Sequence, residues 1–302
     1  MTITRPDPQL SAAAVASPGI CRLRLGEQLR RLREARSLRL GDVAATVGVD
    51  PSTLSRIETG RAPARTCYVL TMLDRYGVDD PDQRRLLADL AREGQRKGWW
   101  TDYADLLPAG AGTYLSLETA AAGICTYTAH TIPALLQAPG YAAAAHHATW
   151  PDLTAGQVAR LAAITLRRQD ILRRDGFRLH AVLDEAALLR TIGSAAVMAA
   201  QLSHLAAAAA SGQVTVQITR LAAAQPVLSP PFTLLTFAGP AGPGLACTSG
   251  GRGETVITKD DSHVRATRRT FTALACAALS PASSARLIRE LAAPPAQPGS
   301  QP

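Results

Sequence analysis

Residues Leu40–Gly60, LGDVAATVGVDPSTLSRIETG, are the stretch that decides the fold of the first part of the chain. Gly48 follows an apolar helical pattern at a point where a helix end requires a positive φ. Asp50 is placed to cap a second helix, and Pro51 occupies its first position, where a missing N–H costs nothing. The stretch therefore predicts a short helix, a tight turn and another short helix.

The second of these helices has two different faces. Leu54 and Ile57 are three residues apart and are expected to point into a core. The polar residues of its first turns are expected on the outer face: Ser52, Thr53, Ser55 and Arg56. A helix-turn-helix presents short hydrogen-bonding groups of this kind to the major groove of DNA.

The flanking sequence extends this helical pattern. Leu25, Leu29 and Leu32 predict a preceding amphipathic helix over 22–36. Further helices are predicted around 68–76 and over 81–93. Three segments carry a resemblance to a known family: LGEQLRRLREARSL (25–38), DVAATVGVDPSTLSRIETGRAPA (42–64) and LTMLDRYGV (70–78). They resemble the XRE family of lambda-repressor-like DNA-binding domains, which implies a five-helix DNA-binding fold. That family usually has Gln at the start of its second helix, where this chain has Gly41.

Positive charge is concentrated on the same segment. Ten arginines and five acidic residues lie between Arg22 and Arg65, in a chain whose net charge is +8. Such a surplus is the electrostatic footprint of a polyanionic partner, here double-stranded DNA. Arg56 is the candidate for pairing with a guanine edge. The further DNA-contact candidates are Arg33, expected on phosphate, Arg39 and Arg61. A solvated arginine face that binds nothing is the alternative.

Length and composition set the class of protein. A chain of 302 residues has room for two domains, and its 47% hydrophobic content contains no apolar run near 18 residues. We expect a soluble, cytoplasmic protein without a membrane segment or signal peptide. The five scattered cysteines contain no C-x-x-C pair, and no cofactor or metal site is expected. The predicted domains are a disordered tail (1–20), a helix-turn-helix domain (21–93), an aromatic linker (94–117), an α+β regulatory or partner-binding domain (118–291) and a second tail (292–302).

The predicted linker gathers aromatic residues in a chain that is only 4% aromatic. Trp99, Trp100 and Tyr103 are candidates for binding a partner or ligand, and Gln137 in the next domain is a fourth. The alternative is that these rings are structural and bury their large apolar surfaces at the junction between domains.

The remainder predicts an α+β domain with a small sheet. The pattern from Glu118 is helical until Pro133 breaks it, and a further helix is expected over 154–174. Helices separate the first predicted strands, so parallel or mixed pairing is expected. The predicted strands are 177–183, 214–218, 232–237, 244–248 and 254–257, and a helix over 260–279 follows.

A second resemblance covers approximately residues 98–291. Its segments include ETAAAGICTYTAHTIPALLQAPGYAAA (118–144), LRRQDILRR (166–174), HAVLDEAALLRTIG (180–193) and PFTLLTF (231–237). They resemble the C-terminal domain of XRE-type regulators from GC-rich, filamentous Gram-positive bacteria, a domain of unknown function. Members are typically encoded beside a small partner protein, and some are antitoxin-like. Ala134 stands where that family usually has Gly.

No catalytic set emerges from the sequence. Asp184 and Glu185 directly follow a predicted strand, where catalytic carboxylates occur, but Asp184 there is better placed to cap the next helix. His146, His147 and His180 lack the spacing of a metal site. We therefore expect a non-enzymatic transcriptional regulator that binds DNA as a homodimer. The alternative is an antitoxin-type protein that neutralises a neighbouring small protein and autoregulates its operon.

Overall fold

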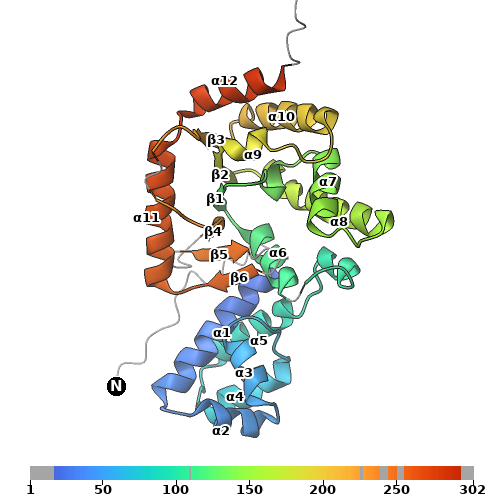
Figure 1. The fold of residues 1–302 in the computed structure, drawn as a ribbon. Helices are drawn as coiled ribbons and strands as arrows, with labels where there is room; N and C mark the ends of the chain where they lie inside the picture. The colour runs from blue at the N-terminus through green and yellow to red at the C-terminus, as the bar shows by residue number, and fades with distance from the viewer. Residues whose placement is uncertain (1–16, 109, 225–226, 239–243, 250–254, 294–302) are drawn as a thin grey trace, which may run out of the picture. The chain divides into compact units, whose positions relative to one another are not determined.

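The computed structural model describes residues 17–108, 110–224, 227–238, 244–249 and 255–293. The chain divides into two compact units (Figure 1). The first comprises Met1–Ala104 with Ala109–Ala120, and the second comprises Asp105–Pro108 with Ala121–Pro302. A helical unit thus precedes an α+β unit, as the sequence predicts.

Five α-helices form most of the first unit. Their bounds are Pro18–Ala35 (α1), Leu40–Val47 (α2), Pro51–Glu58 (α3), Thr66–Arg75 (α4) and Pro81–Gly94 (α5). Fully buried side chains from all five meet in one core, which includes Leu29, Val43, Leu54, Leu73 and Leu87. The predicted five-helix arrangement is therefore confirmed.

The edges of this unit differ from the predicted boundaries. α1 begins at Pro18, so the last three residues of the predicted tail are helical, and Ile20 is buried. The predicted linker contains a 3-10 helix, Trp99–Tyr103 (η2), and most of a sixth α-helix, Ala111–Ala120 (α6). α6 packs on α1, where the backbone N–H of Gly19 donates to Ser116 Oγ at 2.6 Å. The other residues of the two predicted tails lie outside the described residues, except for Ser17, Ala292 and Ala293.

A six-stranded mixed sheet organises the second unit, with the strand order β3-β2-β1-β4-β5-β6. β1, β2 and β3 are parallel, with Ile124 opposite Leu179 and Leu179 opposite Val214. β4, β5 and β6 add antiparallel strands on the other side of β1. The strands are Gly123–Thr128 (β1), Arg178–Asp184 (β2), Val214–Thr219 (β3), Phe232–Thr236 (β4), Leu245–Ser249 (β5) and Thr255–Thr258 (β6).

The prediction of continuous helix after Glu118 was wrong. α6 ends at Ala120, and the central strand of the sheet, β1, starts only three residues later. β1 has a strand on each side and buried residues on both faces, among them Ile124, Thr126 and Tyr127. It therefore lacks the polar alternation that identifies a half-exposed strand, and its alanine-rich flanks imitate a helix. The five other strands were predicted correctly, although residue 254 lies outside the described residues.

Helices cover both faces of this sheet (Figure 1). α11 contacts β1 to β5 on one side, where Phe271 and Leu274 pack on Tyr127, Val182 and Phe232. α7, α8 and α10 lie together on the other side (Figure 1). The helices are Pro139–Thr149 (α7), Ala155–Arg168 (α8), Glu185–Leu189 (α9), Ala195–Ala209 (α10), Asp261–Ala277 (α11) and Pro281–Ala292 (α12), with 3-10 turns Ala134–Leu136 (η3) and Gln169–Arg173 (η4).

α12, which the sequence analysis did not predict, closes the edge of β3. The fully buried Ser284 accepts a hydrogen bond from the backbone N–H of Ile218 at 3.0 Å. The carbonyl of Ile218 accepts from the N–H of Leu279 at 2.9 Å. Both backbone polar groups of Ile218 are therefore hydrogen-bonded, whereas an uncovered edge strand leaves such groups available to pair with a strand of another chain.

No single helix in the described part of the chain is long and apolar enough to cross a membrane. α11 and α12 reach that length only as a pair, and the pair is bent by 68° at its break.

We predict that Ser284→Ala lowers the free energy of unfolding of the second unit by about 1–3 kcal/mol, because the buried N–H of Ile218 loses its acceptor. Urea denaturation of the full chain, followed by circular dichroism, measures the change. Ser283→Ala is the matched control, since the hydroxyl of Ser283 forms an exposed hydrogen bond with that of Ser280 and bonds no other group among the described residues. Equal stability of the two variants would contradict the role of Ser284.

Candidate nucleic-acid interface

The turn between α2 and α3 has the geometry that its sequence predicts. Gly48 adopts a left-handed conformation with φ of 75° at the end of α2. Asp50 caps α3, and its carboxylate accepts a hydrogen bond from the backbone N–H of Ser52 at 2.7 Å. Hydrogen bonds from Ser52 also hold the pKa of Asp50 below its usual value. These local contacts fix where α3 begins and how it leaves the turn.

α3 separates its residues into an inner and an outer face. Leu54 and Ile57 are 0% and 2% exposed, which confirms their predicted place in the core. Ser52, Ser55 and Arg56 are exposed, and Thr53 is half-buried. The guanidinium of Arg56 donates to Thr53 Oγ1 at 3.1 Å, so it lies along the outer face. Hydroxyls and one cation are thus presented together on the side of α3 away from the core.

Arg33 was predicted to contact DNA phosphate from the outer surface, but its side chain is largely buried. Its side chain is 13% exposed and forms a two-pronged ion pair with Glu58, the last residue of α3, whose side chain is 4% exposed. Nε donates to one carboxylate oxygen at 2.7 Å and Nη2 donates to the other at 2.9 Å. Nη1 donates to the carbonyl of Leu38 at 3.0 Å. The prediction of a phosphate contact is therefore corrected, since all three nitrogens of Arg33 already have acceptors inside the protein.

Tyr76 is buried near this ion pair. Burial raises the pKa of its phenol, and the charge of Glu58 adds to the effect. The Tyr76 hydroxyl has no hydrogen-bond partner among the described residues. The Arg33–Glu58 pair therefore lies within the protein interior, where the two charges depend on each other for compensation.

A glycine brings α1 close to the end of α3. A Cβ atom on Gly26 would lie 2.4 Å from the carbonyl oxygen of Ile57 and 2.6 Å from that of Glu58. These obstacles are backbone atoms, so a side chain at this position would require α3 to move. Gly26 and the Arg33–Glu58 pair therefore hold the same end of α3 against α1.

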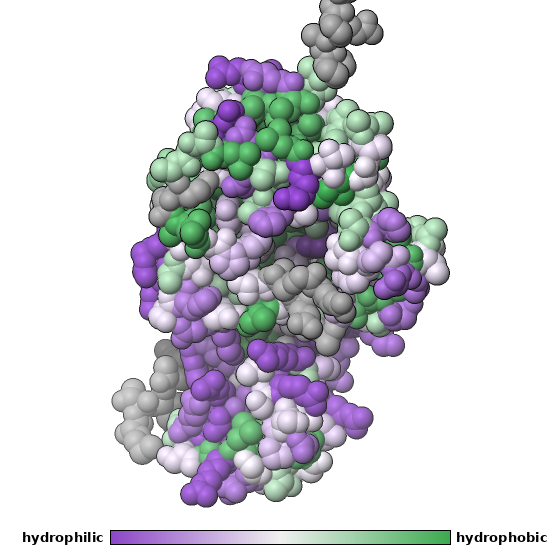
Figure 2. Space-filling model, in the orientation of Figure 1, coloured by the Kyte–Doolittle hydropathy of each residue, from purple (hydrophilic) through white to green (hydrophobic). Residues whose placement is uncertain are grey.

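Several arginines on this unit retain a free charge. Arg30 and Arg31 pair with Glu34 and Glu27 on the same helix, which neutralises part of the predicted surplus. In contrast, six exposed arginines of this unit form no ion pair with any described residue: Arg36, Arg39, Arg56, Arg61, Arg65 and Arg75. Arg39 precedes α2, Arg65 precedes α4, and Arg56 and Arg61 lie on and just after α3. The visible face of α1 to α5 is mostly hydrophilic (Figure 2).

Gly41, near the start of α2, is surrounded by open space, because no atom lies within 4 Å of a Cβ placed there.

The four candidate partner-binding residues have different environments. Trp100 is 8% exposed, and its ring lies about 3 Å from where Gly112 would carry a Cβ. Trp99 is half-buried and makes edge contacts with the rings of Trp100 and Tyr103 at 5.8 and 6.3 Å. The aromatic cluster thus packs within the first unit, and burial at the junction between domains stays a prediction.

Gln137, in the second unit, is buried and serves the backbone. Its Nε2 donates to the carbonyl of Ile132 at 2.8 Å, and its own carbonyl accepts from Gln169 at 2.7 Å. These bonds hold the turn around Pro133, so we correct its assignment from a contact residue to a structural one.

Four polar residues of the second unit that were weighed as chemical groups have structural partners. Asp184 accepts from the N–H of Ala186 at 2.9 Å, which confirms that it caps α9. Glu185 accepts from the N–H of Leu221 at 2.9 Å. His146 bonds Thr165 at 2.9 Å and His180 bonds Gln217 at 2.7 Å.

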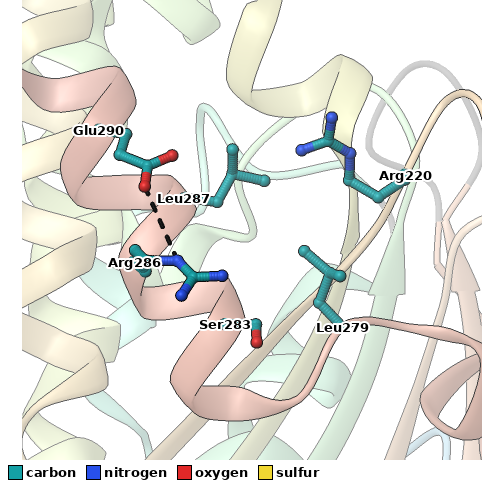
Figure 3. Close-up of a pocket in the computed structure, with 6 residues that line it drawn as sticks. All are labelled: Arg220, Leu279, Ser283, Arg286, Leu287 and Glu290. Atoms are coloured by element: carbon teal, nitrogen blue, oxygen red, sulfur yellow. Dashed lines mark ion pairs between the residues drawn. The ribbon is translucent and has the colours of Figure 1, made fainter.

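One hollow of the second unit contains charged groups that are already paired. Arg286 and Glu290 lie along α12 with 3.7 Å between them, and Arg220 lies opposite (Figure 3). Arg220 pairs with Glu185 at 3.2 Å. Each charged group that lines this hollow therefore already has a partner of opposite charge.

Two residues that position α3, Glu58 and Gly26, were missed in the sequence analysis, and Arg33 was misplaced. Glu58 was counted only as an acidic residue, yet it stands four positions after Leu54 and therefore on the buried face of α3. Arg33 stands four positions after Leu29 and was misplaced for the same reason. Gly26 carries no comparable signal, because its importance lies in a contact with α3.

Comparison with known families agrees with this geometry. Residues 24–87 match a family model described as Helix-turn-helix domain, which supports DNA binding and a role in transcription regulation. Residues 111–290 match a model described as Domain of unknown function (DUF5753). That match covers more than half of the chain, and the chain belongs to this family. Comparison with curated proteins and with solved structures found no match.

We predict that Glu58→Gln lowers the stability of the first unit by about 3 kcal/mol, because Arg33 loses its buried counter-charge and keeps only the exposed Glu34, 3.6 Å away. The matched control is Glu27→Gln, which removes the exposed partner of Arg31 and is expected to cost less than about 1 kcal/mol. Urea denaturation measures both. If Glu58→Gln lowers the free energy of unfolding no more than the control does, the buried ion pair does not stabilise the first unit as proposed.

Two glycine substitutions test the contact between α1 and α3. Gly26→Ala is expected to reduce both stability and DNA affinity, since the new methyl group displaces α3. Gly41→Ala, placed in open space within α2, is expected to stabilise the protein by about 0.5–1 kcal/mol. Thermal unfolding and a gel shift on the same samples measure these effects. Unchanged DNA affinity in Gly26→Ala would show that α3 does not depend on this contact.

Proposed function

We propose that the chain is a sequence-specific transcriptional regulator in which α3 enters the major groove and its outer face contacts base edges. The observation that carries the proposal is the separation of the two faces of α3. Leu54, Ile57 and Glu58 are buried in the protein, whereas the hydroxyls of Ser52 and Ser55 and the guanidinium of Arg56 are exposed. Arginine bidentate to guanine is the commonest specific contact in that groove.

The unpaired arginines supply the sequence-independent part of binding. Arg39, Arg61 and Arg65 lie at the ends of the helices that surround α3, and they are assigned to phosphate. Contacts of this kind set the register of a protein on the duplex and make its affinity fall as salt rises. The resemblance to XRE-type domains supports the same assignment.

We also propose an oligomeric state for the chain and a role for its second unit. We assign the regulator a homodimeric state, in which two first units bind half-sites about one helical turn apart. The second unit is assigned to binding an effector or a small partner protein, and no catalytic step is included. The resemblance to regulators encoded beside small proteins supports this part, and the cytoplasm is the compartment where such a regulator meets DNA.

We predict that Arg56→Ala weakens binding to the operator by about 10–100-fold while binding to random DNA of equal length changes little. The operator is obtained by selecting bound fragments from chromosomal DNA. Arg61→Ala is the comparison variant: it should weaken binding to both DNAs alike and reduce the salt slope by about one.

Arg85→Ala, which removes an exposed arginine from α5, is the control and should change neither DNA affinity. Equal losses for Arg56→Ala on operator and random DNA would show that Arg56 does not read bases. Co-expression of the chain with the neighbouring gene product distinguishes the regulator from the antitoxin-type alternative.

The antitoxin-type alternative predicts that a variant that no longer binds the operator still neutralises the toxicity of that product.

A further inference from the structure

A hollow of about 440 Å³ lies at the carboxyl ends of two parallel strands in the second unit. We call it the strand-end pocket. Tyr127 and His130 line it from the end of β1 and the loop beyond, and Asp184 lines it from the end of β2. Val227, Leu228 and Pro230, which precede β4, form its apolar wall. Ligands of α/β proteins commonly bind outside the carboxyl ends of parallel strands, and this volume is in the range of small-molecule sites.

The Tyr127 hydroxyl is available to a ligand. Tyr127 is only 5% exposed, and its ring packs on Phe232 with 5.9 Å between ring centroids. Its hydroxyl forms no hydrogen bond with any described residue. A phenol held rigidly by its ring at the wall of a hollow is a preorganised hydrogen-bonding group.

Asp184 adds a negative charge beside this phenol. One carboxylate oxygen accepts from the N–H of Ala186 and caps α9. The other oxygen forms no hydrogen bond within the described part of the chain. Burial raises the pKa of Tyr127, and the charge of Asp184 contributes in the same direction, as expected for two groups that are close together. Asp184 is the only acidic or basic side chain, apart from His130, among the described residues that line the pocket.

The apolar wall is incompletely covered. Leu228 is 94% exposed, the highest value among the large exposed hydrophobic residues described. An apolar ligand body placed against Leu228, Val227 and Pro230 would remove this surface from water, which is favourable in proportion to the area buried.

We infer that the strand-end pocket binds a small molecule that combines an apolar body with a protonated amine. The amine donates to the free oxygen of Asp184 and to the Tyr127 hydroxyl, and the body packs on the segment containing Leu228. Calling this molecule an effector rests on the regulatory role proposed for the second unit. Its binding is tested without DNA.

Calorimetric titration of the full chain with tryptamine tests the inference, and indole-3-propionate is the matched probe because it carries a carboxylate on a similar ring and chain. Tryptamine is expected to bind saturably at one site per chain and at least tenfold more tightly than indole-3-propionate. Asp184→Asn should remove this preference while preserving the fold, because Asn is an equally good helix cap. Tyr127→Phe should weaken tryptamine binding about three- to tenfold.

Asp260→Asn is the control, since it makes the same change at the cap of α11, where Asp260 accepts from the N–H of His263. The inference is overturned if tryptamine shows no saturable binding up to about 1 mM, if both probes bind alike, or if Asp184→Asn behaves as Asp260→Asn does. Titration of the same samples with operator DNA distinguishes the two proposals. Intact DNA binding without tryptamine binding overturns the pocket alone, and the reverse result overturns the DNA-reading function alone.

Discussion

The ion pair between Arg33 and Glu58 is the constraint on which the DNA-binding unit depends. It joins α1 to the last residue of α3 with two short hydrogen bonds, and both side chains are largely withdrawn from water. A helix of eight residues is too short to be stable alone, so its position must come from tertiary contacts. Asp50 fixes the start of α3, Leu54 and Ile57 hold its middle, and Glu58 fixes its end. The outer face is then presented in one orientation.

This constraint changes how the positive charge of the segment is interpreted. The arginine surplus in the sequence consists of two populations with different roles. Arg33 is structural, and Arg30 and Arg31 are neutralised on their own helix. Arg36, Arg39, Arg56, Arg61 and Arg65 are exposed and form no ion pair with any described residue. The electrostatic footprint is therefore smaller than the sequence count suggests, but it is concentrated around α3.

Local signals in the sequence predicted the parts of the fold that are determined locally. The glycine at the end of α2, the Asp–Pro pair at the start of α3 and the amphipathic spacing of α1 gave the helix-turn-helix. β1 was missed because a strand buried on both faces carries no alternation, and Arg33 was misplaced because its role depends on a partner 25 positions away. Gln137 was similarly misassigned, since its role comes from the carbonyl groups of a turn that only the fold brings within reach.

The proposed function requires the outer face of α3 to contact base edges in the major groove. Dimethyl sulfate footprinting tests it most directly, because the reagent methylates guanine N7 in the major groove and adenine N3 in the minor groove. With the selected operator, we predict protection of guanine N7 in two patches about one helical turn apart. Protection of adenine N3 alone, or unprotected guanine N7 in a saturated complex, would contradict it.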